Sequence, residues 1–134
     1  MNKRTLTVAT ITILAVVVCL GIVLLRRSNG SFIARTCAEL NSKVPMHIDP
    51  TIDVIRVDPI GGTGIRFNYV FASSVRQMAT KDLVHEQLVP RYTDGYKTDP
   101  TLKEARDRGI VFVYHFAHAD GTFITEFEVD PRRF

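Results

Sequence analysis

The chain has 134 residues, of which 46% are hydrophobic and 23% are charged, and its formal net charge is +3. That charge comes from four basic residues beside one apolar segment, because residues 28–134 carry 13 basic and 14 acidic side chains. A folded part without basic excess argues against a nucleic-acid partner. Its length suits one domain with a single core.

The apolar segment 5–25 contains no charged residue in 21 positions. As a helix it would be roughly 31 Å long, which is enough to cross a bilayer. It is longer than the apolar region of a signal peptide, about 7–15 residues, and Arg26-Arg27 follows it without a small-residue cleavage site. We therefore expect a single-pass transmembrane anchor at 5–25, a linker at 26–30 and a soluble domain at 31–134. A cleaved signal peptide is the alternative.

The two cysteines do not predict an internal disulfide. Cys19 lies inside the apolar segment and Cys37 lies beyond it, so the membrane boundary separates them. Cys37 is interpreted as a small buried side chain, with an intermolecular disulfide or a reactive thiol as alternatives.

The first part of the soluble domain predicts one helix followed by a pair of strands. Ser31 can cap a helix that runs to about Asn41, and His47–Pro50 is expected to form a bend. The β-branched run Ile52–Val57 predicts a strand. After a glycine-rich loop, Ile65–Phe71 alternates apolar and polar residues, which indicates a half-buried strand with one aromatic face.

The second part predicts two short helices and a hairpin. Lys81–Val89 has helical spacing, and Pro90 is expected to kink or end that helix; residues 91–98, which contain Asp94-Gly95, lie between it and the next helix. The next helix is capped by Asp99-Pro100 and ended by Gly109. Ile110–Ala117 and Thr122–Val129 flank Asp120-Gly121, a strong hairpin signal. The fold class is α+β: a small antiparallel four-stranded sheet of two hairpins, with helices on one face.

Several short motifs together resemble a group of small exported or membrane-anchored bacterial proteins of unknown function. The matching residues are Val44-Pro45-x-x-Ile48-Asp49, Ile65-x-Phe67-x-Tyr69, Lys97-Thr98-Asp99-Pro100, Gly109-Ile110-x-Phe112-x-Tyr114-x-Phe116 and Asp120-Gly121. Members often carry two cysteines where this chain has Lys97 or Thr98 and Phe134, so that disulfide is absent here. The resemblance implies an envelope location and a shared fold, and it carries no activity.

The closest approach to a chemical site is His115, His118 and Asp120. The two histidines are three residues apart and face opposite sides of a strand, whereas zinc needs three or four convergent ligands. The distant residues that could complete such a site are His47, Asp49 and His85. A metal-dependent hydrolase is therefore kept only as a minor alternative.

Other motifs favour structure over chemistry. Residues 61–64 (GGTG) lack the lysine and the helix of a phosphate-binding loop, and Ser73-Ser74 lacks a nucleophile elbow. Glu126 and Glu128 suit a solvated sheet face. The aromatic residues of the strands are expected to form the core, and any of them that are exposed would form a ligand or partner surface. These residues are Phe67, Tyr69, Phe71, Phe112, Tyr114, Phe116, Phe123 and Phe127.

We conclude from the sequence that this is a non-enzymatic, single-pass envelope protein that binds another protein as an accessory or inhibitor module. No catalytic, cofactor-binding or metal residues are assigned, no cofactor is expected, and the partner's identity is open. We expect the cell inner membrane with the soluble domain in the periplasm, although the basic residues on both sides of the anchor leave its orientation open. The solvent-exposed face of the terminal hairpin is the first place to look for the protein-binding interface. A small-ligand sensor is the main alternative function.

Overall fold

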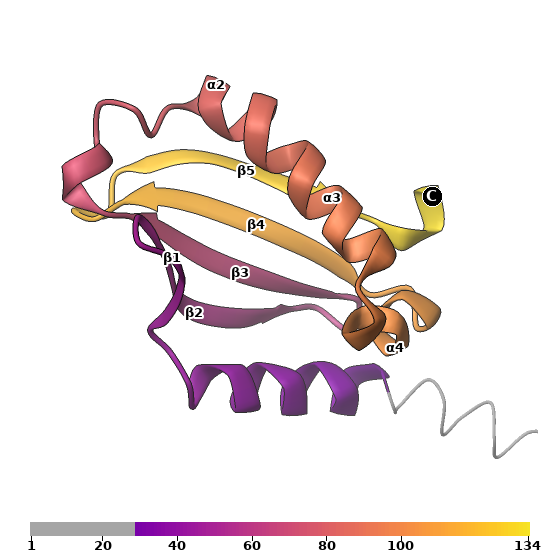
Figure 1. Cartoon of the computed structure of the whole chain (residues 1–134). Coiled ribbons are helices and arrows are strands. Elements are labelled where there is room, and N and C mark those ends of the chain that lie inside the picture. The colour runs from indigo at the N-terminus through magenta and orange to yellow at the C-terminus, as the bar shows by residue number, and fades with distance from the viewer. Residues whose placement is uncertain (1–28) are drawn as a thin grey trace, which may run out of the picture.

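The computed structural model describes residues 29–134, and Figure 1 shows them as a curved sheet with helices packed against it. Within that part of the chain no helix is both long and apolar enough to span a bilayer. The predicted anchor at 5–25 lies outside the described residues. The first helix covers residues 29–41, so Ser31 lies within it and is not its cap, whereas its end at Asn41 is as predicted.

The sheet has five strands in the order β1-β2-β3-β4-β5. They are β1 (Met46–Asp49), β2 (Ile52–Ile60), β3 (Gly64–Phe71), β4 (Val111–His118) and β5 (Phe123–Val129). The two predicted hairpins, β2–β3 and β4–β5, are antiparallel, but β3 and β4 pair in parallel. The prediction of a four-stranded antiparallel sheet is therefore wrong. The helical segment between β3 and β4 carries the chain back to the end of the sheet where β3 begins, as a parallel connection requires.

The extra strand β1 forms where a bend was expected. Met46 pairs with Val54 and His47 with Asp53, and the register shifts before Asp49 pairs with Ile52. The Asp49-Pro50 step does turn the chain, because Asp49 accepts hydrogen bonds from the backbone and hydroxyl of Thr51, both at 2.7 Å. The bend is thus the turn of a tight hairpin, and the residues before it complete the ladder.

The segment between β3 and β4 is more helical than expected. After a short 3₁₀ turn, η1 (Ser73–Val75), the chain forms α2 (Lys81–Leu83), a π-helical turn η2 (Val84–Leu88) and α3 (Val89–Thr98). Pro90 therefore does not end the helix, and 91–98, which was expected to separate two helices, is itself helical. Tyr92 and Tyr96, one helical turn apart, pack against strand aromatics, and this burial outweighs the weak helix propensity of Asp94-Gly95.

The next helix follows its sequence signals closely. Asp99 accepts a hydrogen bond from the Thr101 backbone at 2.8 Å, at the start of η3 (Pro100–Leu102) and α4 (Lys103–Asp107). Gly109 then has φ +69°, the left-handed conformation that ends a helix. A last 3₁₀ turn, η4 (Pro131–Arg133), closes the chain.

The helices and the aromatic face of the sheet share one core. Phe116 is 0% exposed, and its ring stacks on Tyr69 with centroids 4.9 Å apart. Ile33 and Cys37 of the first helix belong to the same cluster of buried residues. Cys37 is free, as expected for a buried side chain, and burial together with the charge of Asp58 raises the pKa of its thiol.

The opposite face of the sheet carries ion pairs. Glu126 Oε2 lies 2.9 Å from His115 Nδ1 and 3.5 Å from Arg66 Nε. Phe123 lies near this face, because the register between β4 and β5 shifts beside it. The centroid of its ring is 5.1 Å from that of the His115 ring, and the residue is 59% exposed. Its assignment to the core is therefore wrong.

Candidate functional site

A cleft of about 280 Å³ lies where the sheet ends beneath the bent helix. It is bordered by the β1–β2 turn, the end of β3, the loop after η1 and one side of the helical segment 83–91. The lining residues are Asp49, Thr51, Ile52, Phe71, Val75, Met78, Ala79, Leu83, Gln87, Leu88 and Arg91. Its volume is at the lower end of the range of about 300–1,000 Å³ that is typical of small-molecule pockets.

The lining is apolar at its base and polar at its rim. Ile52, Phe71 and Leu88 are 4%, 3% and 8% exposed and belong to the domain core. Met78 at the rim is 69% exposed, the highest value among the exposed large hydrophobic residues of 29–134. An apolar base beside an unbranched, adaptable methionine is typical of surfaces that bind protein side chains.

The π-helical turn sets the position of the rim. The Val89 amide donates to the Val84 carbonyl, one residue further back than in an α-helix, and Pro90 follows without an amide hydrogen. The wide turn therefore accommodates a proline that would break a regular helix. It brings Leu88, Gln87 and Arg91 to the same side of the helix, above the end of the sheet.

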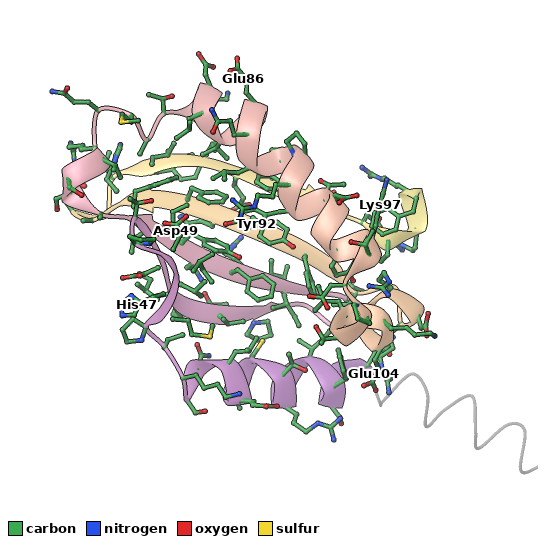
Figure 2. All side chains as sticks on the ribbon, viewed as in Figure 1. His47, Asp49, Glu86, Tyr92, Lys97 and Glu104 are labelled. Atoms are coloured by element: carbon green, nitrogen blue, oxygen red, sulfur yellow. The ribbon has the colours of Figure 1, made fainter. Side chains whose placement is uncertain are left out.

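The rim carries one fixed negative charge and one positive charge. Burial by itself would raise the pKa of Asp49, but hydrogen bonds from Thr51 and Ile52 and the charge of Arg91 outweigh it and hold that pKa below its usual value. Burial raises the pKa of Tyr92, which lies on the same side of the domain as Asp49 (Figure 2). At neutral pH the rim therefore presents a carboxylate and a guanidinium beside the apolar residues at the bottom of the cleft.

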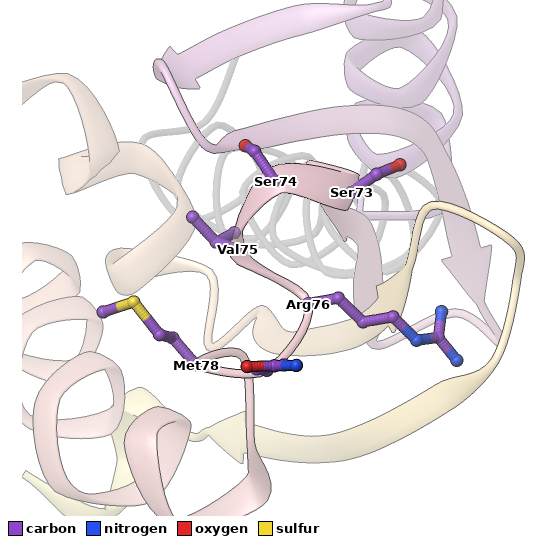
Figure 3. Close-up of a pocket in the computed structure, with 6 residues that line it drawn as sticks. Ser73, Ser74, Val75, Arg76 and Met78 are labelled. Carbon is purple, nitrogen blue, oxygen red and sulfur yellow. The ribbon is translucent and has the colours of Figure 1, made fainter.

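A second hollow, of about 440 Å³, lies within the loop of residues 73–78 (Figure 3). Ser73 and Ser74 line it, and no histidine is among its lining residues. Arg76 instead donates to Asp120 at 2.7 Å and ties this loop to the β4–β5 turn. The hydrogen bonds from Thr122 lead the effects that lower the pKa of Asp120 to about 2, and Arg76 adds to them.

The histidines do not converge. His115 lies on the ion-paired face beside Glu126, whereas His118 is paired in register with core residue Phe71, so the two face opposite sides as predicted. His47 bonds to Asp53, and His85 to Thr125. Across residues 29–134 there is no group of three metal-ligating side chains. The geometry therefore gives no support to a metal-dependent hydrolase.

The remaining predicted features have structural roles. Gly61, with φ +54°, turns the chain between β2 and β3. Glu126 and Glu128 face outward on β5, and their partners Arg66, His115 and Arg133 are within 4.0 Å. The solvent-exposed face of the terminal hairpin is thus a polar surface on which acidic and basic side chains pair with one another. Among the aromatic strand residues only Phe71 borders the cleft, which gives a ligand-sensing pocket no support.

The cleft was not predicted, and the sequence held one weak signal for it. A proline within a helical pattern, Pro90, marks an irregular helix, and such turns are frequent at functional sites. Met78 could not be distinguished from a loop residue, because its exposure beside the core depends on the position of the 72–80 loop.

Comparisons with known proteins give a shared fold. No protein-family model and no curated protein matches the sequence. The structure is similar to EpsS, described as a pilotin of the Vibrio vulnificus type 2 secretion system (TM-score 0.67, 14% identity, 81% of this chain and 93% of that one). It is also similar to AspS, described as a type II secretion system pilotin from Vibrio cholerae (0.66, 12%, 84% and 98%). A protein of Pseudomonas aeruginosa described as secreted has the same fold (0.65, 12%, 80% and 93%).

Proposed function

We propose that this protein is a non-enzymatic envelope protein that binds another protein through the cleft between the sheet end and the bent helix. The segment 5–25 would anchor it in the inner membrane through the linker 26–30, with the domain 31–134 in the periplasm. Its partner would belong to an envelope assembly such as a secretion system, so that the protein is an accessory subunit and not an inhibitor of an enzyme.

The observation that carries the proposal is the composition of the cleft. Buried core side chains form its base, Met78 stands open at its edge, and Asp49 and Arg91 supply charges of both signs. Fully desolvated apolar anchors surrounded by polar groups are the usual energetic centre of a protein interface. The likeness to two structures described as pilotins supports the assignment to a secretion assembly.

Site-specific photocrosslinking in native membranes tests the proposal. A photoreactive amino acid replaces Met78 in the full chain, and in a matched variant it replaces Phe123, which is 59% exposed on the other side of the sheet. We expect a discrete crosslinked partner, identified by mass spectrometry as an envelope protein, from position 78 alone. Equal products from both positions, or none from position 78, would contradict the cleft as the binding site.

A charge reversal then separates specific binding from proximity. Arg91→Glu changes the rim and is expected to lower the yield of the position-78 product at least fivefold. Arg56→Glu, a reversal of an exposed arginine of β2 outside the cleft, is expected to leave it unchanged. If both reversals had the same effect, the cleft rim would have no part in recognition.

A further inference from the structure

Three segments that are distant in sequence form one end of the domain. Asn29, where the described chain begins, exchanges two hydrogen bonds with Arg108 after α4. The aliphatic part of the Arg132 side chain lies beside Gly109, 3.8 Å from where a Cβ atom on that glycine would be. The ring centroids of Tyr96 and Phe134 are 5.9 Å apart. Figure 1 accordingly shows the start of the first helix, α4 and the C-terminus at the same end.

This end is cationic while the rest of the domain is anionic. The segments 29–35, 97–108 and 128–134 hold seven Lys and Arg residues against five Asp and Glu residues. The remainder of residues 28–134 holds six against nine. Arg26 and Arg27 come immediately before this end and add to its positive charge. A single net charge for the domain hides this asymmetry.

The cations at this end are accessible, and an aromatic residue stands among them. The side chains of Lys103, Arg132 and Arg133 are 71%, 69% and 76% exposed. Phe134 is 51% exposed, with the ammonium group of Lys97 5.0 Å from its ring centroid. Carboxylates pair with several of these cations, for example Asp130 with Arg132 at 2.8 Å, so the excess of positive charge is modest.

The tether holds this end close to the bilayer if 5–25 is the membrane span. Residues 26–28 separate the span from Asn29, and a chain of that length reaches at most about 14 Å when extended. Basic residues are attracted to anionic headgroups at such a distance, and aromatic side chains favour the interface between headgroups and acyl chains. Tether, charge and aromatic residue therefore all favour the same occupant, a lipid surface.

We propose that the end formed by 29–35, 97–108 and 128–134 rests on an anionic lipid surface, with Arg132 and Arg133 at the headgroups and Phe134 in the interface. This proposal rests on the membrane anchor of the proposed function. It directs the cleft away from the bilayer, because β3 begins at this end and terminates at Phe71 in the cleft.

The chain contains no tryptophan, which permits a single-site test. The full chain carrying Phe134→Trp is reconstituted into vesicles of phosphatidylcholine, with or without the anionic lipid phosphatidylglycerol. Its fluorescence is quenched by lipids brominated on the upper acyl chain. The matched control is Met78→Trp, 69% exposed at the opposite end. We expect at least twofold stronger quenching at 134 than at 78, and stronger quenching at 134 with phosphatidylglycerol than without it.

Charge reversal and membrane retention distinguish the ways in which the proposal can fail. Arg132→Glu/Arg133→Glu is expected to abolish the effect of phosphatidylglycerol at position 134, and Arg76→Glu/Arg91→Glu to leave it unchanged. Two results in a chain that stays in the membrane at alkaline pH would overturn this proposal alone. One is equal quenching at 134 and 78, and the other is quenching at 134 that does not depend on phosphatidylglycerol. Release of the chain at alkaline pH overturns the anchor, and this proposal with it.

Discussion

Replacement of Tyr96 by phenylalanine isolates one buried hydrogen bond between α3 and the sheet. The Tyr96 hydroxyl donates to the Ile110 carbonyl at 2.6 Å, and both residues are 1% exposed. Burial raises the pKa of Tyr96 to about 12, so the hydroxyl keeps its proton throughout the neutral range. The substitution keeps the ring, whose centroid is 4.2 Å from that of Phe112, and removes only the donor.

The expected loss follows from the acceptor that the substitution leaves behind. A buried carbonyl without a partner costs about 1–3 kcal/mol, and this one belongs to Ile110, immediately before β4. We expect the free energy of unfolding to fall by about 2 kcal/mol and the melting temperature by roughly 8–10 °C for a domain of this size. Thermal unfolding of the full chain in detergent micelles, followed by near-ultraviolet circular dichroism of the tyrosines, measures the change.

Tyr92→Phe is the matched control for that measurement. Its ring also packs on the sheet, 5.1 Å from Tyr114, but within the described residues its hydroxyl has no hydrogen-bond partner. We expect a change of less than about 0.5 kcal/mol. Similar losses in the two variants would mean that tyrosine packing, and not the bond to Ile110, holds α3 on the sheet.

Two further predictions concern backbone conformation and thiol accessibility. Gly109→Ala is expected to destabilise by about 1 kcal/mol because φ is +69°, whereas Gly95→Ala in α3 is expected to stabilise by about 0.5–1 kcal/mol; urea unfolding of both variants checks the opposite signs. In a Cys19→Ser chain, Cys37 is expected to react with a thiol reagent at least tenfold more slowly when folded than in urea, because the residue is 4% exposed and the pKa of its thiol is raised. Equal rates would place this cysteine at the surface.

Local chemistry made part of this fold predictable. Asp99 and Gly109 bound a helix because a carboxylate accepts the first amide hydrogens and glycine adopts positive φ, and neither effect depends on the rest of the chain. The same holds for Asp120-Gly121, where Asp120 accepts from the Thr122 amide at 2.9 Å and Gly121 has φ +89°. Signals of this kind predicted the β2–β3 and β4–β5 hairpins, but not the β1–β2 hairpin.

The errors came from contacts between distant segments. Nothing in 64–71 or 111–118 indicates that these strands lie beside each other in parallel, since that pairing depends on the helical crossover. Likewise Asp94-Gly95 has the composition of a turn, and only the stacking of Tyr92 and Tyr96 on strands more than ten residues away makes 89–98 helical. The prediction for this segment followed its local turn propensity, whereas tertiary packing determines the helix that is observed.

The cleft depends both on local backbone conformation and on contacts between distant segments, so no short sequence motif predicts it. Its base is built from residues that any buried strand or helix would contain, such as Ile52, Phe71 and Leu88. These become a binding surface only because the sheet ends at Phe71 and the π-helical turn lifts the next helix above that end. A change that restores a regular helix there, by removing Pro90, should therefore alter partner binding without touching any residue of the lining.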